Sequence, residues 1–231
     1  MHVFRDRRNA GRRLAQRCDR FSGQPGPIVL ALPRGGVPVA YEIARRLTAP
    51  LDVFVVRKLG VPGRAELAMG AVASGGIEVV DHRLIALLGV SRAAFEAVEA
   101  RERAELERRD RVFHAQRPLL DVAGKIAILV DDGLATGATM AAAIDAVRSR
   151  DPARVVAAVP IAPPEICDAL TDRADEVICL VTPTRLLAVG AWYEDFAQTT
   201  DDEVTELLYA AALAYPGGAV PTPPGSSGSS I

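Results

Sequence analysis

The sequence predicts a single α/β domain with a mostly parallel central sheet flanked by helices. Predominantly apolar runs recur at 28–32, 51–56, 126–130, 155–162 and 176–181. Such runs are typical of strands that are buried on both faces. Segments with helical spacing separate several of these runs, and strands that alternate with helices form parallel sheets. The 231 residues, 49% of them hydrophobic, suffice for one sizeable core.

Charge and cysteine content exclude several classes of protein. The formal net charge is -2, so the chain as a whole has no attraction to nucleic acid or anionic membranes. Cys18, Cys167 and Cys179 form no C-x-x-C pattern, which argues against a zinc site or a disulfide framework and fits a reducing cytoplasm. No apolar signal core begins the chain, and no apolar run approaches the ~18 residues of a membrane span. We expect a cytoplasmic protein without a membrane partner.

The first elements read as helix, strand, loop and helix. Ala10, Leu14, Cys18 and Phe21 recur at helical spacing, and arginines cover the other side of this first helix. We interpret that side as a solvated face rather than a nucleic-acid patch. The strand at 28–32 leads through Pro33-Arg34-Gly35-Gly36 into a second helix that carries Pro38 in its first turn.

The middle of the chain departs from the simple alternation of strands and helices. After the strand at 51–56, residues 57–64 are rich in glycine and positive charge, which predicts an exposed mobile loop. Residues 69–73 and 77–80 flank Ser-Gly-Gly like a hairpin. Residues 91–117 are highly charged with i,i+4 pairs, which predicts a long helix within a helical insertion at about 83–117, or a dimer arm.

The remaining chain completes the sheet and then loses apolar content. A helix is expected at 139–150, and residues 182–215 are expected to form a small C-terminal hood. Residues 216–231 are proline, glycine and serine with little to bury, which predicts a disordered tail. We therefore expect one domain over 1–215, with its core at about 22–162.

The stretch "ILVDDGLATGAT", residues 128–139, carries the clearest chemical signal. A buried strand runs into two adjacent acids and then a loop of glycines and threonines at the start of a helix. Loop N–H groups at a helix N-terminus favour a phosphate. Asp131 and Asp132 repel that anion but can accept hydrogen bonds from neutral hydroxyls beside it. Vicinal ribose hydroxyls next to a 5'-phosphate meet this requirement, whereas neither a P-loop nor a dinucleotide fingerprint is present.

These residues resemble the signature of the type I phosphoribosyltransferases, a family with a Rossmann-like sheet. The resemblance implies ribose binding by Asp131 and Asp132. It assigns the 5-phosphate to Gly133, Leu134, Ala135, Thr136, Gly137, Ala138 and Thr139. Pro33-Arg34-Gly35-Gly36 is similar to the family's pyrophosphate-binding loop, so Arg34, Gly35 and Gly36 are the candidates for that role. Residues 57–73 resemble its mobile catalytic loop and flanking strands.

The resemblance implies transfer of ribose 5-phosphate from phosphoribosyl pyrophosphate (PRPP) to a purine or pyrimidine base, as in nucleotide salvage. Arg34, with Lys58 or Arg57, would stabilise the departing pyrophosphate, and Glu66 is the candidate general base. Closure of residues 60–67 would exclude water. The implied cofactor is Mg²⁺, held mainly by PRPP and water with Asp131 and Asp132 as further candidate ligands. A homodimer is also implied.

The acceptor base stays open at this stage. In 6-oxopurine enzymes of this family an aspartate occupies the position that is Ala135 here, so the loop looks more like the adenine and uracil type. Trp192 and Tyr193 are the candidate base-binding residues, although Trp192 and Phe196 at a spacing of four could equally pack on one face of a turn. The rival hypothesis is a non-catalytic PRPP-binding regulator that contacts nucleic acid through its arginine-rich first helix.

Overall fold

The computed structural model describes residues 3–24, 26–114 and 119–215, and the predicted tail at 216–231 lies outside them. Its centre is a five-stranded sheet in which every neighbouring pair is parallel, in the order β2-β1-β6-β7-β8. The strands are β1 (Pro27–Ala31), β2 (Leu51–Val53), β6 (Ile126–Val130), β7 (Arg154–Ile161) and β8 (Glu176–Val181). The predicted parallel sheet is confirmed.

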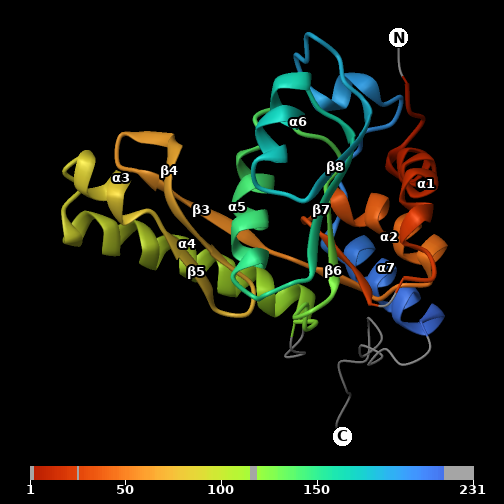
Figure 1. Ribbon diagram of the computed structural model, residues 1–231, viewed down its shortest axis with the longest axis horizontal. Helices are drawn as coiled ribbons and strands as arrows, with labels where there is room; N and C mark the ends of the chain where they lie inside the picture. Colours follow the sequence, from red (N-terminus) through yellow and green to blue (C-terminus); the bar gives the residue numbers. More distant parts are fainter. Residues whose placement is uncertain (1–2, 25, 115–118, 216–231) are drawn as a thin grey trace, which may run out of the picture.

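Helices cover both faces of this sheet (Figure 1). One face carries α1 (Arg7–Cys18), α2 (Gly36–Leu47) and α7 (Asp201–Ala214), and the other carries α5 (Ala138–Arg148) and α6 (Pro164–Thr171). Successive strand side chains point to opposite faces, so Val29 packs beneath the first group and Ile28 beneath the second. Burial on both faces explains why β1 and β6, inside the sheet, are continuously apolar.

A second sheet and two helices form an arm that extends away from the parallel sheet (Figure 1). The antiparallel order β3-β4-β5 joins β3 (Val56–Val61), β4 (Arg64–Ala73) and β5 (Ile77–Val80). Then follow α3 (His82–Leu87) and α4 (Arg92–His114). The hairpin predicted at 69–73 and 77–80 and the long charged helix are both confirmed.

The predicted exposed loop at 57–64 is wrong. Most of these residues belong to the antiparallel pair β3 and β4, with register shifts on either side of Gly60. Leu59 and Val61 are buried in the core that α4 shares. The glycines and the proline sit at the bulge and the turn, while a helix far along the sequence supplies the burial that makes β3 a strand.

Two short 3-10 segments complete the chain, η1 (Asp19–Phe21) and η2 (Val189–Trp192). Within the predicted hood segment, α7 packs against α2, whereas η2 lies beside the N-terminal residues. Val3 and Phe4 both donate their backbone N–H groups to the carbonyl of Trp192, at 3.1 and 3.0 Å. The segment around η2 is thereby tied to the start of the chain.

A buried polar network fixes the C-terminal end of α4 to the parallel sheet. The Nε2 atom of His114 lies 3.1 Å from the carbonyl of Val53 and 3.4 Å from Asp52, and its Nδ1 atom lies 3.3 Å from Asp110. The hydroxyl of Ser74 donates to Asp110 at 2.7 Å. Burial alone would lower the pKa of His114, but its hydrogen bonds and charge interactions with Asp110 and Asp52 raise that pKa to about 9.

This network predicts a pH-dependent contribution to stability. Because the folded-state pKa lies above the unfolded value, the contribution of His114 is fully present below about pH 6.5 and is lost as the pH rises through about 9. Its full size is roughly 3 kcal/mol. We expect the His114→Gln variant to be less stable than the wild type at pH 6 and to differ little from it above pH 9.

Urea unfolding at pH 6, 7.5 and 9 measures this difference. The His82→Gln variant is the matched control, since His82 is exposed at the start of α3. If the gap between wild type and His114→Gln stays constant over this range, the charged network does not stabilise the arm.

Candidate functional site

The acidic pair lies where two neighbouring strands end. Asp131 and Asp132 directly follow β6, the central strand, and β1 runs beside it in parallel. The Leu32 N–H extends this pairing by donating to the carbonyl of Val130 at 2.8 Å. The loops after both strands therefore emerge side by side at the carboxyl edge of the sheet, where open α/β sheets bind ligands.

Two glycines allow the loop after β1 to approach the acids. A Cβ atom at Gly35 would overlap the carboxylate of Asp132, and one at Gly36 would lie 2.6 Å from the carbonyl of Val130. Any side chain at either position would push the loops apart. The N–H of Gly36 donates to the carbonyl of Leu32 at 3.0 Å, so the start of α2 already uses one of the two N–H groups assigned to pyrophosphate.

The loop from Gly133 to Thr139 is fastened at one end and open at the other. Leu134 is buried and donates its N–H to the carbonyl of Ile161 at 2.9 Å, which holds the loop to β7. Gly137, with φ of 71°, caps α5 in a left-handed conformation that favours glycine. Thr136 and Thr139 are exposed. Hydroxyls beside a helix N-terminus suit an anion, as predicted for a phosphate.

Arg7 is a site residue that the sequence analysis missed. Its Nε atom donates to Asp132 at 2.7 Å, and its Nη1 atom donates to the carbonyl of Ala197 at 2.6 Å. The guanidinium lies 3.8 Å from the centre of the Phe196 ring. The helical pattern predicts a solvated face for the arginines of α1, and nothing in the sequence links Arg7 to an acid 125 positions away.

The two acids differ in their surroundings. Burial raises the pKa of Asp131 well above its usual range, and the neighbouring carboxylate of Asp132 raises it further. The N–H of Asp132 donates to Asp131 at 2.8 Å, which opposes this effect in part. An acid that resists ionisation, beside one paired with Arg7, suits hydrogen bonds with neutral hydroxyls.

Lys58 and the end of the phosphate loop line the same cavity, which has a volume of about 450 Å³. Lys58 and Arg57 of β3 line it together with Thr139 at the start of α5. Arg57 is already bound by Glu102 of α4 at 2.9 and 2.6 Å. Burial opposes ionisation of Glu102, but hydrogen bonds from Arg57 and a second arginine lower its pKa. Arg57 therefore fastens the hairpin to α4, and Lys58 lines the same cavity as Thr139 of the loop.

The remaining predicted catalytic residues lie on different elements. Arg34, in the loop before α2, lies 3.5 Å from Asp201 at the start of α7. Its peptide bond with Pro33 is cis. Glu66 belongs to β4, but its side chain lies outside the described part of the structure.

Tyr193 lies inside the core rather than on an open surface. It is 2% exposed, and its ring packs between those of Phe4 and Phe196 at centroid distances of 5.3 and 4.9 Å. Its hydroxyl donates to the carbonyl of Asp132 at 2.5 Å, and burial raises its pKa, which keeps that donor protonated. Tyr193 thus supports the acidic pair instead of offering a ring face to a base. Trp192 is partly exposed and packs against the same cluster, as the packing alternative predicted.

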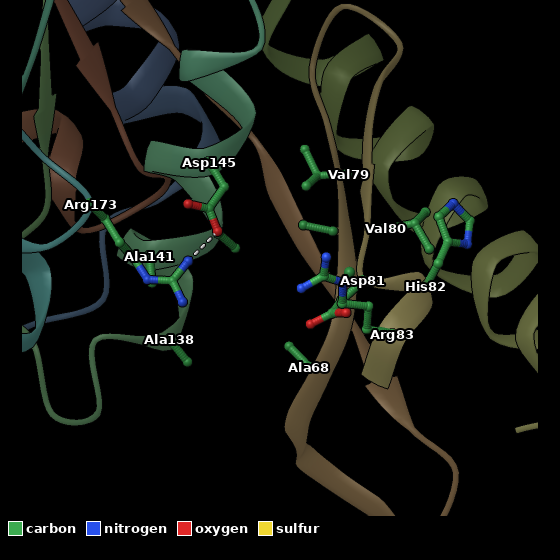
Figure 2. A pocket seen from close by; sticks show the side chains of 13 residues that line it. Ala68, Val79, Val80, Asp81, His82, Arg83, Ala138, Ala141, Asp145 and Arg173 are labelled. Atoms are coloured by element: carbon green, nitrogen blue, oxygen red, sulfur yellow. Dashed lines mark hydrogen bonds and ion pairs between the residues drawn. The ribbon is translucent and has the colours of Figure 1, made fainter. Parts of the chain in front are cut away.

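The largest cavity described, about 570 Å³, lies beyond the phosphate loop (Figure 2). Figure 2 shows the β5–α3 junction facing α5 across it, with Asp81 and Arg83 on one side and the Asp145–Arg173 ion pair on the other. Its α5 wall consists largely of alanines. Ala138 of the phosphate loop lines this cavity, but Asp131 and Asp132 do not. We therefore place the site at the acidic pair and not in this cavity.

Two further observations concern a metal ion and a membrane as partners. Within residues 3–24, 26–114 and 119–215, no three His, Cys, Asp or Glu side chains cluster as a protein-only metal site would require. In the same ranges, no helix is both long and apolar enough to cross a bilayer. The longest, α4, has 23 residues and is highly charged.

Comparison with known proteins supplies the family context. The sequence pattern of the phosphoribosyl transferase domain matches residues 63–183, slightly more than half of the chain. A Mycobacterium tuberculosis H37Rv protein, provisionally named as a phosphoribosyl transferase, is 49% identical over 208 residues. That match covers 90% of this chain but 47% of the relative, so this chain spans about half the length of its relative.

A solved structure extends the likeness to the fold. The protein TT1426 of Thermus thermophilus is 47% identical, with a TM-score of 0.79. The match covers 90% of this chain and 98% of the Thermus protein. The arrangement of sheet and helices described above is therefore shared with a protein of known structure.

The Arg7–Asp132 pair predicts a stability effect that separates it from the other arginines of α1. The two side chains are 12% and 15% exposed, and removing one partner of such a pair leaves a poorly hydrated charge. We expect Arg7→Met to lower the free energy of unfolding at pH 7 by about 3 kcal/mol. Arg17→Met, an exposed change on the same helix, should alter it by less than about 0.5 kcal/mol. Urea denaturation of both variants measures this, and equal midpoints would contradict the assigned role of Arg7.

Proposed function

Because this chain belongs to the phosphoribosyl transferase domain family, we propose that it transfers ribose 5-phosphate from PRPP to a nitrogenous base and releases pyrophosphate. One observation carries the proposal: Gly35 of the loop after β1 lies against Asp132, so the predicted pyrophosphate loop adjoins the acids and the phosphate loop. In this proposal the diphosphate, the ribose hydroxyls and the 5-phosphate of PRPP each have one of these three segments as their binding partner at one edge of the sheet.

The donor is held at three points in this proposal. The 5-phosphate binds at the N-terminus of α5, where Thr136 and Thr139 add hydroxyl donors. The 2'- and 3'-hydroxyls donate to Asp131 and Asp132. The diphosphate on C1 then extends toward Arg34 and Gly35. Asp132 is held in place for this task from two directions, by Arg7 and by Tyr193.

Charge stabilisation drives the reaction. The C1–O bond breaks and pyrophosphate leaves with its electron pair while a base nitrogen forms the new bond to C1. Positive charge develops on the sugar and negative charge on the leaving group, so Arg34 and Lys58 lower the barrier by binding the anion more strongly as it departs. The acids offer the oxygen ligands that Mg²⁺ prefers, and bound Mg²⁺ would neutralise charge on the diphosphate.

Water must be excluded because it competes with the base for C1. The β3–β4 turn carries residues 60–67 at the end of a two-stranded hairpin, so closure would move a stiff ribbon rather than a loose loop. Glu66 on that ribbon is our candidate for removing the proton from the attacking nitrogen.

The predicted Mg²⁺ requirement, homodimer and cytoplasmic location stay predictions.

The acceptor that fits best is a base of the adenine or uracil type. Ala135, exposed in the phosphate loop, offers no group for proton transfer to a 6-oxopurine. Of the two aromatic candidates, only Trp192 is partly exposed, so it is the one that could stack on a base.

The rival hypothesis, a PRPP-binding regulator on nucleic acid, has less support from α1. Arg8 and Arg12 both bind the buried Glu42, while Arg13 donates to the carbonyl of Val3. Each of these arginines has a partner within the molecule, while Arg8 and Arg12 still keep 49% and 41% of their side chains exposed. A phosphate-binding surface needs arginines that neutralise phosphates instead of internal carboxylates.

The proposal predicts base-dependent release of pyrophosphate. With PRPP and Mg²⁺ present, adenine, guanine, hypoxanthine, xanthine, uracil and orotate are supplied one at a time, and pyrophosphate is measured. We expect release with at least one base, adenine or uracil first. Saturable PRPP binding by calorimetry without release under any condition would favour the regulator instead.

A second prediction concerns Asp132 alone. Asp132→Asn keeps the shape but removes the charge that strengthens a hydrogen bond to a hydroxyl, so kcat/KM for PRPP should fall roughly 10- to 100-fold. Asp168→Asn, an exposed change on α6, should leave kcat/KM unchanged. Steady-state kinetics, with circular dichroism as the folding check, measures both. Equal kinetics in the two variants would place the sugar elsewhere.

A further inference from the structure

The charged helix α4 presents one continuous face to the candidate site. Val98, Arg101 and Glu102 line the cavity that holds Lys58 and Thr139. Further along the helix, Arg108, Arg109, Val112 and Phe113 line a second cavity together with Arg34. Within each set every position lies three or four residues from another, and the two sets are related by seven residues (101 to 108 and 102 to 109), so they form a single stripe along the helix. The helix therefore runs along the side of the site on which the diphosphate lies in the proposed function.

The second cavity, about 130 Å³, is lined by more cationic than anionic side chains. Three arginines and one carboxylate are its only charged lining residues among those the structure describes: Arg34, Arg108, Arg109 and Asp201. Its volume is several times the ~30 Å³ that one water molecule occupies in the liquid, so a phosphate group can enter with little rearrangement. Arg34, which lines the cavity, directly precedes Gly35, where an added Cβ atom would overlap the carboxylate of Asp132.

Glu105 holds the two helix arginines in this arrangement. It accepts from Arg108 and from Arg109, each at 2.8 Å. Hydrogen bonds from these two arginines lower the pKa of Glu105 to about 2, so it stays ionised at neutral pH. Glu105 does not line the cavity, whereas Asp201 does and lies 3.5 Å from Arg34. Asp201 is the one carboxylate in the position that an incoming anion would take.

We propose that Arg108 and Arg109 of α4 complete, with Arg34, a binding site for the diphosphate end of the sugar donor, and that Asp201 pairs with Arg34 until that anion binds. The inference rests on the proposed function and assigns a task to the charged helix. Guanidinium groups bind phosphate oxygens through paired N–H donors, and three of them around one cavity match the several charges of a diphosphate. A monoanionic carboxylate such as Asp201 competes weakly with such a ligand.

The test measures binding of inorganic pyrophosphate by calorimetry at low salt, with ribose 5-phosphate as the second ligand. We expect the double variant Arg108→Gln with Arg109→Gln to bind pyrophosphate about tenfold more weakly, since two charge-assisted contacts are lost. Arg34→Ala should have a similar effect. Asp201→Asn should bind pyrophosphate more tightly than the wild type, because the competing charge is gone. Ribose 5-phosphate affinity should not change in any of these variants.

The matched control is Arg111→Gln, an exposed arginine on the same helix that does not line the cavity. Circular dichroism checks that each variant folds, and Asp201→Asn keeps the test decisive if the double variant does not. Pyrophosphate affinity of the double variant equal to that of Arg111→Gln, or unchanged affinity in Asp201→Asn, overturns the inference. If the wild type binds ribose 5-phosphate and PRPP but not pyrophosphate, the inference falls and the proposed function stands. If it binds none of the three, both fall.

Discussion

The side-by-side endings of β1 and β6 are the constraint on which the candidate site depends. The pairing of β1 with β6 continues to the hydrogen bond that the N–H of Leu32 donates to the carbonyl of Val130. The segments after the two strands therefore leave the sheet at the same level. Only then can Gly35 lie against Asp132. The buried strands beneath resist relative sliding, since a shift in register would move apolar side chains out of two cores at once.

Features whose cause is local were predictable from the sequence. The strands at 126–130 and 176–181 were predicted with the boundaries that the structure has, because both are predominantly apolar runs bounded by polar residues. The phosphate loop was predictable for the same reason, since its acids, glycines and threonines are consecutive. The strand β3 was not, because its burial comes from α4, some 40 residues away, while Gly60 and the Pro62-Gly63 turn after it signal a loop.

The supports of the acidic pair lay beyond sequence reasoning. Arg7 and Tyr193 both hold Asp132, yet they come from opposite ends of the described chain. Each had an ordinary local interpretation, as a solvated helix residue and as an exposed aromatic. Nothing in a helical pattern distinguishes an arginine that faces water from one that meets a carboxylate brought there by the fold. A site built on consecutive residues is thus visible in sequence, whereas the residues that brace it are not.

The anchoring of α4 gives this helix the mechanics of a lever. The C-terminal end of α4 is fixed to the parallel sheet at His114, and its other end, at Arg92, lies within the arm. At 1.5 Å per residue, Arg92 lies roughly 33 Å from that fulcrum and Arg109 roughly 7 Å, so a tilt moves the tip about four times as far as the arginine. A tilt of the arm about His114 would therefore reach Arg109 as a displacement about a quarter of that at Arg92.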